Sequence, residues 1–239
     1  MDNYEIKHGV AVIPADVTEI RDFSFKGCSS LERVELHEGV KKIGYFAFKD
    51  CPLLKSIEIP ASVTSIGWGV FENCPALESI IIEEGNMYVD SRNNCNAVIR
   101  SFGDSLVATC SATVIPETVV EIDKWAFAYS NREEITIPET VTTINPGVFL
   151  GCSNLKSVAI LGPIKDLGNP FSPHTSTPAL EYVTFGAGIK KMDEYILSDI
   201  PNLKAINVPA KKGAYYKKRL PEEVHHLVVE MEPVKKAKK

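Results

Sequence analysis

Hydrophobic residues recur along the chain at a fixed spacing. The clearest copy spans residues 59–82, and its apolar positions are Ile59, Val63, Ile66, Phe71, Cys74, Leu77, Ile80 and Ile82. Three successive copies keep this spacing and close at Leu36, Ile59 and Ile82, so the repeat is 23 residues long. A unit this short cannot bury its own hydrophobic side and must stack on its neighbours. The pattern therefore predicts one continuous solenoid rather than separate globular units.

Four later copies follow the same pattern with more variation. The fourth, residues 122–137, lacks one residue where Cys and Leu are expected, and the fifth, residues 144–160, is intact. The sixth, residues 167–185, is stretched by the loop at 172–179, and the seventh spans residues 192–208. A period of 23 residues falls in the range of leucine-rich repeats, about 20–29 residues. About seven coils are therefore expected.

Each copy predicts two short strands and a turn. Residues 54–59 alternate and are rich in β-branched side chains, which is typical of a strand with Ile57 and Ile59 facing inward. Residues 64–66 predict a second short extended piece, and residues 69–74 a single helical or 3₁₀ turn. Stacked copies should form a parallel sheet along one wall and turns along the other. Columns of Phe, Cys, Leu and Ile should lie between the walls.

Residues 83–114 break the repeat, because Ile115 follows Ile82 by 33 residues instead of 23. Within this insert, residues 96–109 predict a β-hairpin with its turn at residues 102–105. We expect the hairpin to replace a convex segment and to lie against the stack. The solenoid should span residues 1–209, followed by a C-terminal cap at 210–232 and a basic tail at 233–239.

Charge and composition narrow the classes of partner. The chain carries a net charge of −5, and residues 210–239 hold nine Lys or Arg against four Glu, so residues 1–209 carry −10. An acidic body argues against nucleic-acid binding. No apolar run is long enough to span a membrane. The first ten residues lack the order of a signal peptide, which leaves a secreted or surface protein whose export signal was removed, or a cytoplasmic one.

Four cysteines share one repeat position and should form a buried column with the repeated phenylalanines. The column comprises Cys28, Cys51, Cys74 and Cys152 with Phe25, Phe48, Phe71, Phe127 and Phe149. Neighbouring coils lie about 4.8 Å apart, but their side chains point the same way, which favours core packing over disulfides or metal binding. Cys95 and Cys110 lie on opposite hairpin arms, so a bridge and two free thiols both stay open. No sequence motif predicts a catalytic residue, a metal site or a cofactor.

The side chains between the inward strand positions should face the concave wall. They are Arg33, Glu35, His37, Ser56, Glu58, Ser79, Ile81, Glu83, Glu134, Thr136, Ser157, Ala159, Leu161, Tyr182, Thr184, Ala205 and Asn207. The first coils are acidic and polar, whereas the later ones carry small or apolar side chains and a tyrosine. Such a wall suits a binding groove with Ile81, Leu161 and Tyr182 as anchors. The alternative is that short side chains simply accommodate the curvature.

The motif Ile-Pro-x-x-Val-x-x-Ile-Gly-x-x-x-Phe-x-x-Cys-x-x-Leu-x-x-Ile-x-Ile at residues 59–82 resembles the BspA-like (Treponema-type) leucine-rich repeat family of bacterial surface proteins. Residues 90–110 also resemble an irregular segment of that family, and the likeness covers about residues 10–230. It implies a curved, right-handed, β-rich solenoid of the α/β leucine-rich repeat type, which acts in adhesion or protein binding without catalysis.

Three hypotheses about the function follow from the sequence. The leading hypothesis is a monomeric, non-catalytic module that binds a protein or glycan at a bacterial surface through the concave wall. A structural spacer within a larger surface assembly is the first alternative. A carbohydrate-active hydrolase, with a site assembled from distant residues, is the second.

Overall fold

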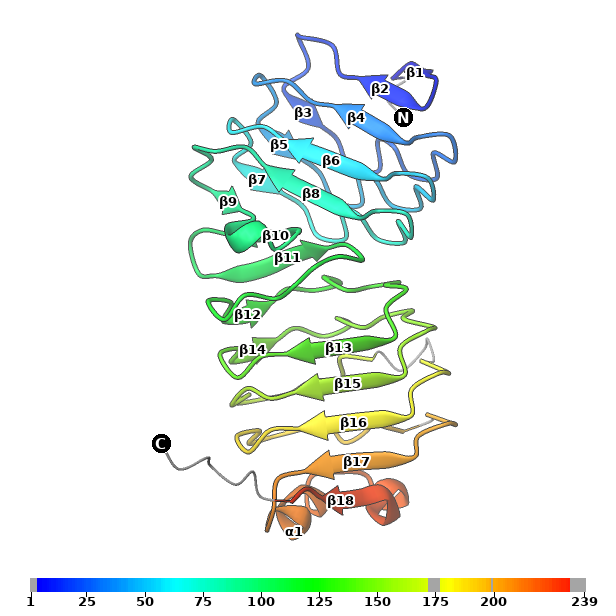
Figure 1. Cartoon of the computed structure of the whole chain (residues 1–239), viewed down its shortest axis with the longest axis vertical. Helices are drawn as coiled ribbons and strands as arrows, with labels where there is room; N and C mark the ends of the chain where they lie inside the picture. The colour runs from blue at the N-terminus through cyan, green and yellow to red at the C-terminus, as the bar shows by residue number, and fades with distance from the viewer. Residues whose placement is uncertain (1–3, 172–176, 199, 233–239) are drawn as a thin grey trace.

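The computed structural model describes residues 4–171, 177–198 and 200–232. The chain forms an elongated stack of coils, with the N-terminal coils at one end and the C-terminal elements at the other (Figure 1). Most of the predicted loop at 172–179 and the whole of the predicted tail at 233–239 lie outside the described residues.

Each coil contributes one strand to the wall that was predicted to be concave, here called the first wall. Its strands are β2 (Val10–Val12), β4 (Arg33–Glu35), β6 (Ser56–Ile59), β8 (Ser79–Ile82), β13 (Glu134–Ile137), β15 (Ser157–Ile160), β16 (Tyr182–Phe185), β17 (Ala205–Val208) and β18 (Val228–Glu230). Neighbouring strands within each sheet pair in parallel and align equivalent residues of successive repeats, such as Ile57 with Ile80. A short strand, β1 (Ile6–Lys7), pairs antiparallel with β2 at the N-terminal end.

The described part of the chain has about nine turns, so the expected number of seven was too low. The seven repeats account for β4, β6, β8, β13, β15, β16 and β17. The two additional coils end the stack. Strand β2 precedes the first Phe-x-x-Cys motif, and β18 follows helical turns instead of that motif. The repeat pattern therefore did not include them.

Short strands on the opposite side of each coil form a second wall. Strands β3 (Glu19–Ile20), β5 (Lys42–Ile43) and β7 (Ser65–Ile66) pair in parallel, and β12 (Glu121–Ile122) pairs in the same way with β14 (Thr143–Ile144) further along. A glycine follows the second-wall strands β5 and β7. A Cβ atom at Gly67 would lie 2.5 Å from the backbone nitrogen of Tyr45 in the preceding coil, so the close approach of the two backbones requires glycine there.

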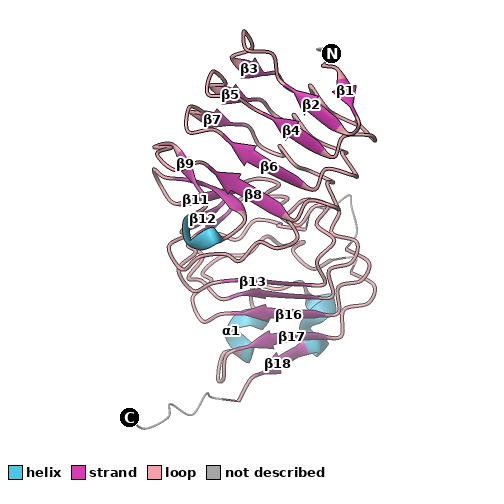
Figure 2. Ribbon diagram, turned by 45° about the horizontal axis from the view of Figure 1, so that its top comes forward, coloured by secondary structure: helices cyan, strands magenta, loops and turns pink. Residues whose placement is uncertain are grey.

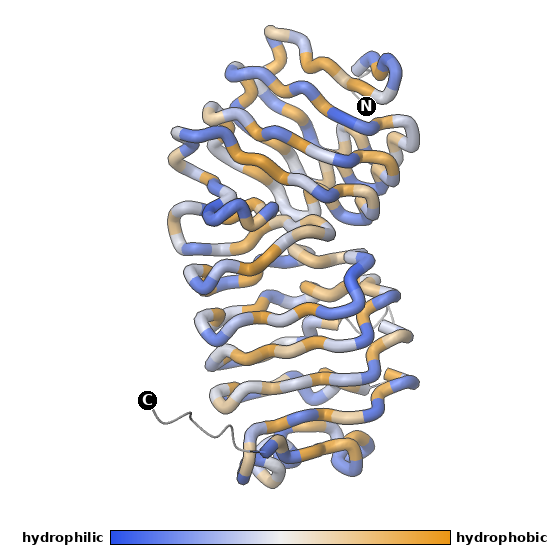
Figure 3. The backbone as a smooth tube through the Cα atoms, viewed as in Figure 1, coloured by the Kyte–Doolittle hydropathy of each residue, from blue (hydrophilic) through white to orange (hydrophobic). Residues whose placement is uncertain are grey.

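The core lies between the two walls and is built from the repeated apolar positions. In β6, Ile57 and Ile59 are buried while Glu58 between them is exposed. Hydrophobic and hydrophilic residues alternate along the tube in the same way (Figure 3). Phenylalanine rings stack from coil to coil, with centroid distances of 5.2 Å between Phe25 and Phe48 and 5.7 Å between Phe48 and Phe71.

The insert forms the predicted hairpin. Strands β10 (Ala97–Arg100) and β11 (Ser105–Thr109) pair antiparallel, and β9 (Val89–Asp90) pairs with the other edge of β10. A 3₁₀ turn, η1 (Arg92–Asn94), connects β9 to β10. Strand β11 pairs in parallel with β12, so the hairpin continues the sheet of the second wall.

The hairpin replaces a segment of the second wall, as expected, but it lies inside the stack rather than against it. Its two faces belong to two different cores: Ile99 and Leu106 pack with the C-terminal coils, and Val98 and Val107 pack with the N-terminal coils. The strands carry apolar residues on both faces, and such strands must be covered on both sides. The hairpin is therefore an internal layer, and the first-wall strands are tilted differently on its two sides (Figures 1 and 2).

Helix α1 (Gly213–Lys217), the 3₁₀ turn η2 (Glu222–Leu227) and strand β18 close the last coil. Strand β18 pairs in parallel with β17, and the buried ring of Tyr216 stacks on Phe185 with a centroid distance of 5.6 Å. The division of the chain at residues 209 and 232 into solenoid, cap and tail stays a prediction. No helix in the described residues has the length and apolar character needed to cross a bilayer.

Candidate functional site

The outward side chains of the N-terminal coils form one continuous surface. The parallel register places Arg33 beside Ser56, Ser56 beside Ser79, and Glu58 beside Ile81. A shallow groove in this surface is lined by the outward side chains of Arg33, Glu35, Ser56, Glu58, Ile81 and Glu83. Arg33 pairs with Glu35, so the remaining carboxylates leave the groove acidic. We call this surface the N-terminal face.

The Glu38–Glu83 pair and His37 lie at the margin of the N-terminal face. The carboxyl groups of Glu38 and Glu83 share a hydrogen bond, which raises the pKa of Glu83 and lowers the pKa of Glu38. The ring of His37 is held by the backbone, because Nδ1 accepts the Gly39 N–H at 2.9 Å and Nε2 lies 2.9 Å from the Pro14 carbonyl oxygen. These backbone bonds use both nitrogens of the predicted site residue His37.

The outward side chains of β13, β15, β16 and β17 form a second surface, here called the C-terminal face. Its register places Ser157 beside Tyr182 and Ala159 beside Thr184, and Asn207 donates a hydrogen bond to the Thr184 hydroxyl at 3.3 Å. The Tyr182 side chain is 41% exposed, and the ammonium group of Lys204 lies 6.0 Å from its ring centroid. This face also carries Glu134, Thr136, Leu161 and Ala205, as the alternation of the strands predicts.

The structure does not join these two faces into the single wall expected from the sequence. Strand β8 is the last strand of one sheet and β13 is the first of another, and no ladder connects them within the described residues. The hairpin layer separates the two sheets. The predicted residues from Arg33 to Glu83 therefore lie together, and those from Glu134 to Asn207 form a separate group.

The repeated cysteines act as hydrogen-bond donors between coils. The thiol of Cys51 donates to the Phe25 carbonyl at 3.1 Å, and that of Cys152 donates to the Phe127 carbonyl at 3.0 Å. Burial raises the pKa of Cys152 to about 12. Cys28 and Cys74 are only partly buried, because Cys28 lies near the N-terminal end and Cys74 lines the seam beside the hairpin.

Cys95 and Cys110 are free thiols, so of the two alternatives left open by the sequence the structure favours free thiols over a disulfide bridge. Cys95 packs in the core of the C-terminal coils, whereas Cys110 packs in the core of the N-terminal coils, so the two residues lie on different sides of the layer. Burial raises the pKa of both thiols. Within the part of the chain that the structure covers, no cluster of three or more His, Cys, Asp or Glu side chains is placed to hold a metal ion.

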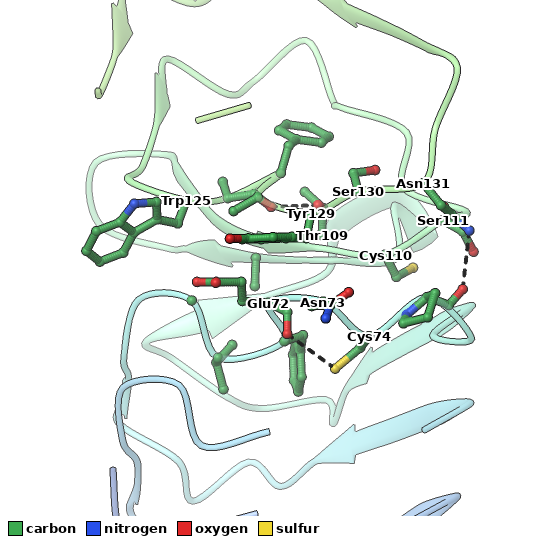
Figure 4. Close-up of a pocket in the computed structure, with 18 of the residues that line it drawn as sticks. Glu72, Asn73, Cys74, Thr109, Cys110, Ser111, Trp125, Tyr129, Ser130 and Asn131 are labelled. Carbon is green, nitrogen blue, oxygen red and sulfur yellow. Dashed lines mark hydrogen bonds between the residues drawn. The ribbon is translucent and has the colours of Figure 1, made fainter. Parts of the chain in front are cut away.

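A narrow pocket lies at the seam where the N-terminal coils meet the hairpin (Figure 4). The carboxylate of Glu72 is buried there and pairs with the ammonium group of Lys49 at 2.5 Å. That ammonium group also lies 5.3 Å from the ring centroid of Phe46 and 5.7 Å from that of Tyr129. The ion pair lies within the N-terminal half, and the contact between Lys49 and Tyr129 crosses the seam.

The two tryptophans of the chain also meet at this seam, which the sequence interpretation did not foresee. The rings of Trp68 and Trp125 are 6.4 Å apart, and the indole N–H of Trp68 donates to Asp123 at 3.2 Å. Trp125 has a φ angle of 59°, in the left-handed region that the equivalent position adopts in other coils, where it holds glycine (Gly69, Gly147) or phenylalanine (Phe23, Phe46). Aligning the position two residues before the repeated Phe would have revealed that it holds either glycine or an aromatic residue.

Solved structures of bacterial repeat proteins share this architecture. A leucine rich cell surface protein from Faecalibacterium prausnitzii is 28% identical, with a TM-score of 0.67 over 84% of this chain and 53% of that chain. The pneumococcal vaccine antigen PcpA is 17% identical, with a TM-score of 0.60 over 84% of this chain and 62% of that chain. A leucine-rich repeat protein from Eubacterium ventriosum is 18% identical, with a TM-score of 0.53 over 83% and 72% of the two chains.

The chain thus spans about half the length of the first of these structures. A comparison with curated proteins gives no match. A family model described as BspA type Leucine rich repeat region (6 copies) matches residues 4–104 and 94–204. Since these matches cover most of the sequence and agree with the coils described above, the chain belongs to the BspA-type leucine-rich repeat family.

Proposed function

We propose that this protein is a non-catalytic binding module that recognises a partner protein at a bacterial cell surface through the N-terminal face of its first wall. The groove of the N-terminal face is the observation that carries the proposal. The similarity to a bacterial cell surface protein supports the location. The expected behaviour is affinity without turnover.

The composition of the groove matches that of a recognition surface. Ile81 is 50% exposed on β8, although its side chain is large and apolar. It is surrounded by the polar side chains of Ser56, Glu58 and Glu83. Protein interfaces commonly combine an apolar centre with a polar rim. Ile81 is therefore the proposed anchor, and the carboxylates form the rim.

Charge indicates the kind of partner that this face would select. Glu58 and Glu83 are unmatched by a nearby cation of the face, since Arg33 is paired with Glu35. Electrostatic complementarity across an interface raises the association rate and selects against partners of the wrong sign. A partner that presents Lys or Arg around an apolar side chain fits this groove.

The test uses the intact chain as bait for surface proteins of its native host cells, followed by measurement of the dissociation constant. Ile81→Ala should weaken binding about tenfold, as expected for loss of an anchor side chain. Glu58→Lys should weaken it by a similar factor, mainly through a slower association. The matched control is Glu139→Lys, since Glu139 is also exposed and lies outside the groove.

Wild-type affinity in both Ile81→Ala and Glu58→Lys, with folding unchanged, would exclude the N-terminal face as the site. Loss of affinity in Tyr182→Ala alone would move the site to the C-terminal face. A captured glycan instead of a protein would correct the class of partner. The elongated stack also suits a structural spacer, and the absence of any captured partner would favour that role.

A further inference from the structure

The first wall has an unpaired strand edge in the middle of the stack. In the ladder between β13 and β15, the Glu133 carbonyl accepts the Ser157 N–H at 3.1 Å, and the Ile137 carbonyl accepts the Leu161 N–H at 3.1 Å. Alternate residues of a parallel strand bond to the same neighbour. The backbone N–H and C=O groups of Glu134 and Thr136 therefore point away from β15. No described residue provides a backbone partner for them.

A groove runs along this edge. Its lining includes Thr113, Val114, Ile115, Phe127, Ile135 and Pro138. The Val114 side chain is 70% exposed, although it is apolar. Arg132 reaches across the groove, where its guanidinium group donates to the Thr113 carbonyl. A side chain, rather than a backbone ladder, thus connects β13 to the segment that precedes it.

The two ends of the stack are covered, and the facing edge of β8 is covered in part, whereas the edge of β13 has no backbone partner among the described residues. Strand β1 pairs with β2 at the N-terminal end, and α1 and η2 close the C-terminal end. On β8, the Ile80 carbonyl accepts the Ser91 hydroxyl at 3.4 Å, and the nearby Leu77 carbonyl accepts the Ser111 N–H at 3.1 Å. Strand β13 contains no proline or lysine, the residues that commonly protect an edge from pairing.

We propose that an extended segment of a partner protein binds in this groove as an added strand and pairs with the backbone groups of Glu134 and Thr136. Unpaired N–H and C=O groups at the spacing of a strand are complementary to another extended polypeptide. Partner residues that point inward would contact the apolar lining at Ile135. Those that point outward would lie beside Glu134, where a basic or hydroxyl side chain is favoured.

The proposed strand-binding site consists of backbone atoms at a sheet edge, whereas the site of the proposed function consists of the outward side chains of the N-terminal face. Either can fail without the other, because Glu58→Lys and Ile81→Ala leave the edge of β13 unchanged. The proposal therefore adds a second mode of recognition to the module.

The probe is a fluorescently labelled peptide that copies residues 53–60 of the chain, Leu-Leu-Lys-Ser-Ile-Glu-Ile-Pro. This segment contains β6, which holds toward β8 the position that the added strand would hold toward β13. Binding is measured by fluorescence anisotropy on the full chain. The same peptide with Ile57→Pro cannot form the ladder and serves as the control peptide.

Two variants of one residue separate edge pairing from other contacts. Thr136→Pro removes the outward N–H but leaves the ladder bonds of Ile135 and Ile137 to β15 intact. Thr136→Val keeps the N–H and is the matched control. We expect Thr136→Val to bind like the wild type and Thr136→Pro to bind about tenfold more weakly. Equal binding by the wild type and Thr136→Pro would overturn the proposal.

Hydrogen exchange gives a second readout that requires no variant. In the free chain, the amides of Glu134 and Thr136 should exchange rapidly while those of Ile135 and Ile137 are protected, and the peptide should protect all four. Protection of Glu134 and Thr136 in the free chain would overturn the proposal. If that protection grew with protein concentration, the occupant would be a second copy of this chain.

A further variant keeps the test valid if Thr136→Pro does not fold. Val114→Glu places a charge in the groove, and its exposed position leaves folding unaffected. It should weaken the peptide about tenfold, and unchanged affinity in Val114→Glu would contradict the assigned groove.

Discussion

Truncation of Phe48 should cost more stability than truncation of Phe71, although both belong to the same column. Phe48 is fully buried, and its ring lies 5.2 Å from that of Phe25 and 5.7 Å from that of Phe71. Phe71 is followed by the hairpin layer and, among the described rings, stacks only on Phe48. Removing a buried phenylalanine typically costs about 3–5 kcal/mol, and each ring pair adds about 0.5–1.5 kcal/mol. We therefore expect losses of about 5 kcal/mol for Phe48→Ala and about 4 kcal/mol for Phe71→Ala.

Urea denaturation followed by circular dichroism measures both free energies of unfolding. The emission of Trp68 and Trp125 reports separately on the seam between the two halves. Phe102→Ala is the control, because Phe102 is 76% exposed in the hairpin turn and its loss should change stability by less than about 0.5 kcal/mol. A loss in Phe71→Ala that equals or exceeds the loss in Phe48→Ala would refute the reasoning from stacked rings.

Three other perturbations follow from the structure. Cys51 and Cys152 are fully buried, so alkylating reagents should modify them only when urea unfolds the chain, and modification of the folded protein would contradict their place in the core. Burial of Asp90 opposes ionisation, but hydrogen bonds from Arg92 outweigh it and lower the carboxyl pKa below its unfolded value. The resulting stability is present above about pH 4 and is lost as the pH falls through the lower folded pKa. Arg92→Ala should therefore lower the free energy of unfolding by about 2 kcal/mol at pH 7 and by almost nothing in strong acid. A difference between wild type and variant that is the same at every pH would exclude the Asp90 carboxylate as its cause. Trp125→Gly should be about 1 kcal/mol less destabilising than Trp125→Ala in urea, because only glycine relieves the left-handed backbone, and the reverse order would show that strain is absent.

The sequence was sufficient to predict the structure of a single coil. Ile57 and Ile59 alternate with Glu58 over a few residues, and this local alternation determines which side of the strand faces the core. The constant period then brought Ser56 beside Ser79 without further information, because stacked copies of equal length align equivalent residues. The residues of the N-terminal face could be predicted from the sequence for the same reason.

Only the tertiary structure decided where the insert lies and what it does to the first wall. The residues of β10 and β11 predict a hairpin, yet whether one or both of its faces are covered depends on packing partners far away in the sequence. Burial of Val98 in one core and Ile99 in the other requires a place inside the stack, and this position separates β8 from β13. Periodicity reports on contacts between equivalent residues, whereas the open edge of β13 arises where that equivalence ends.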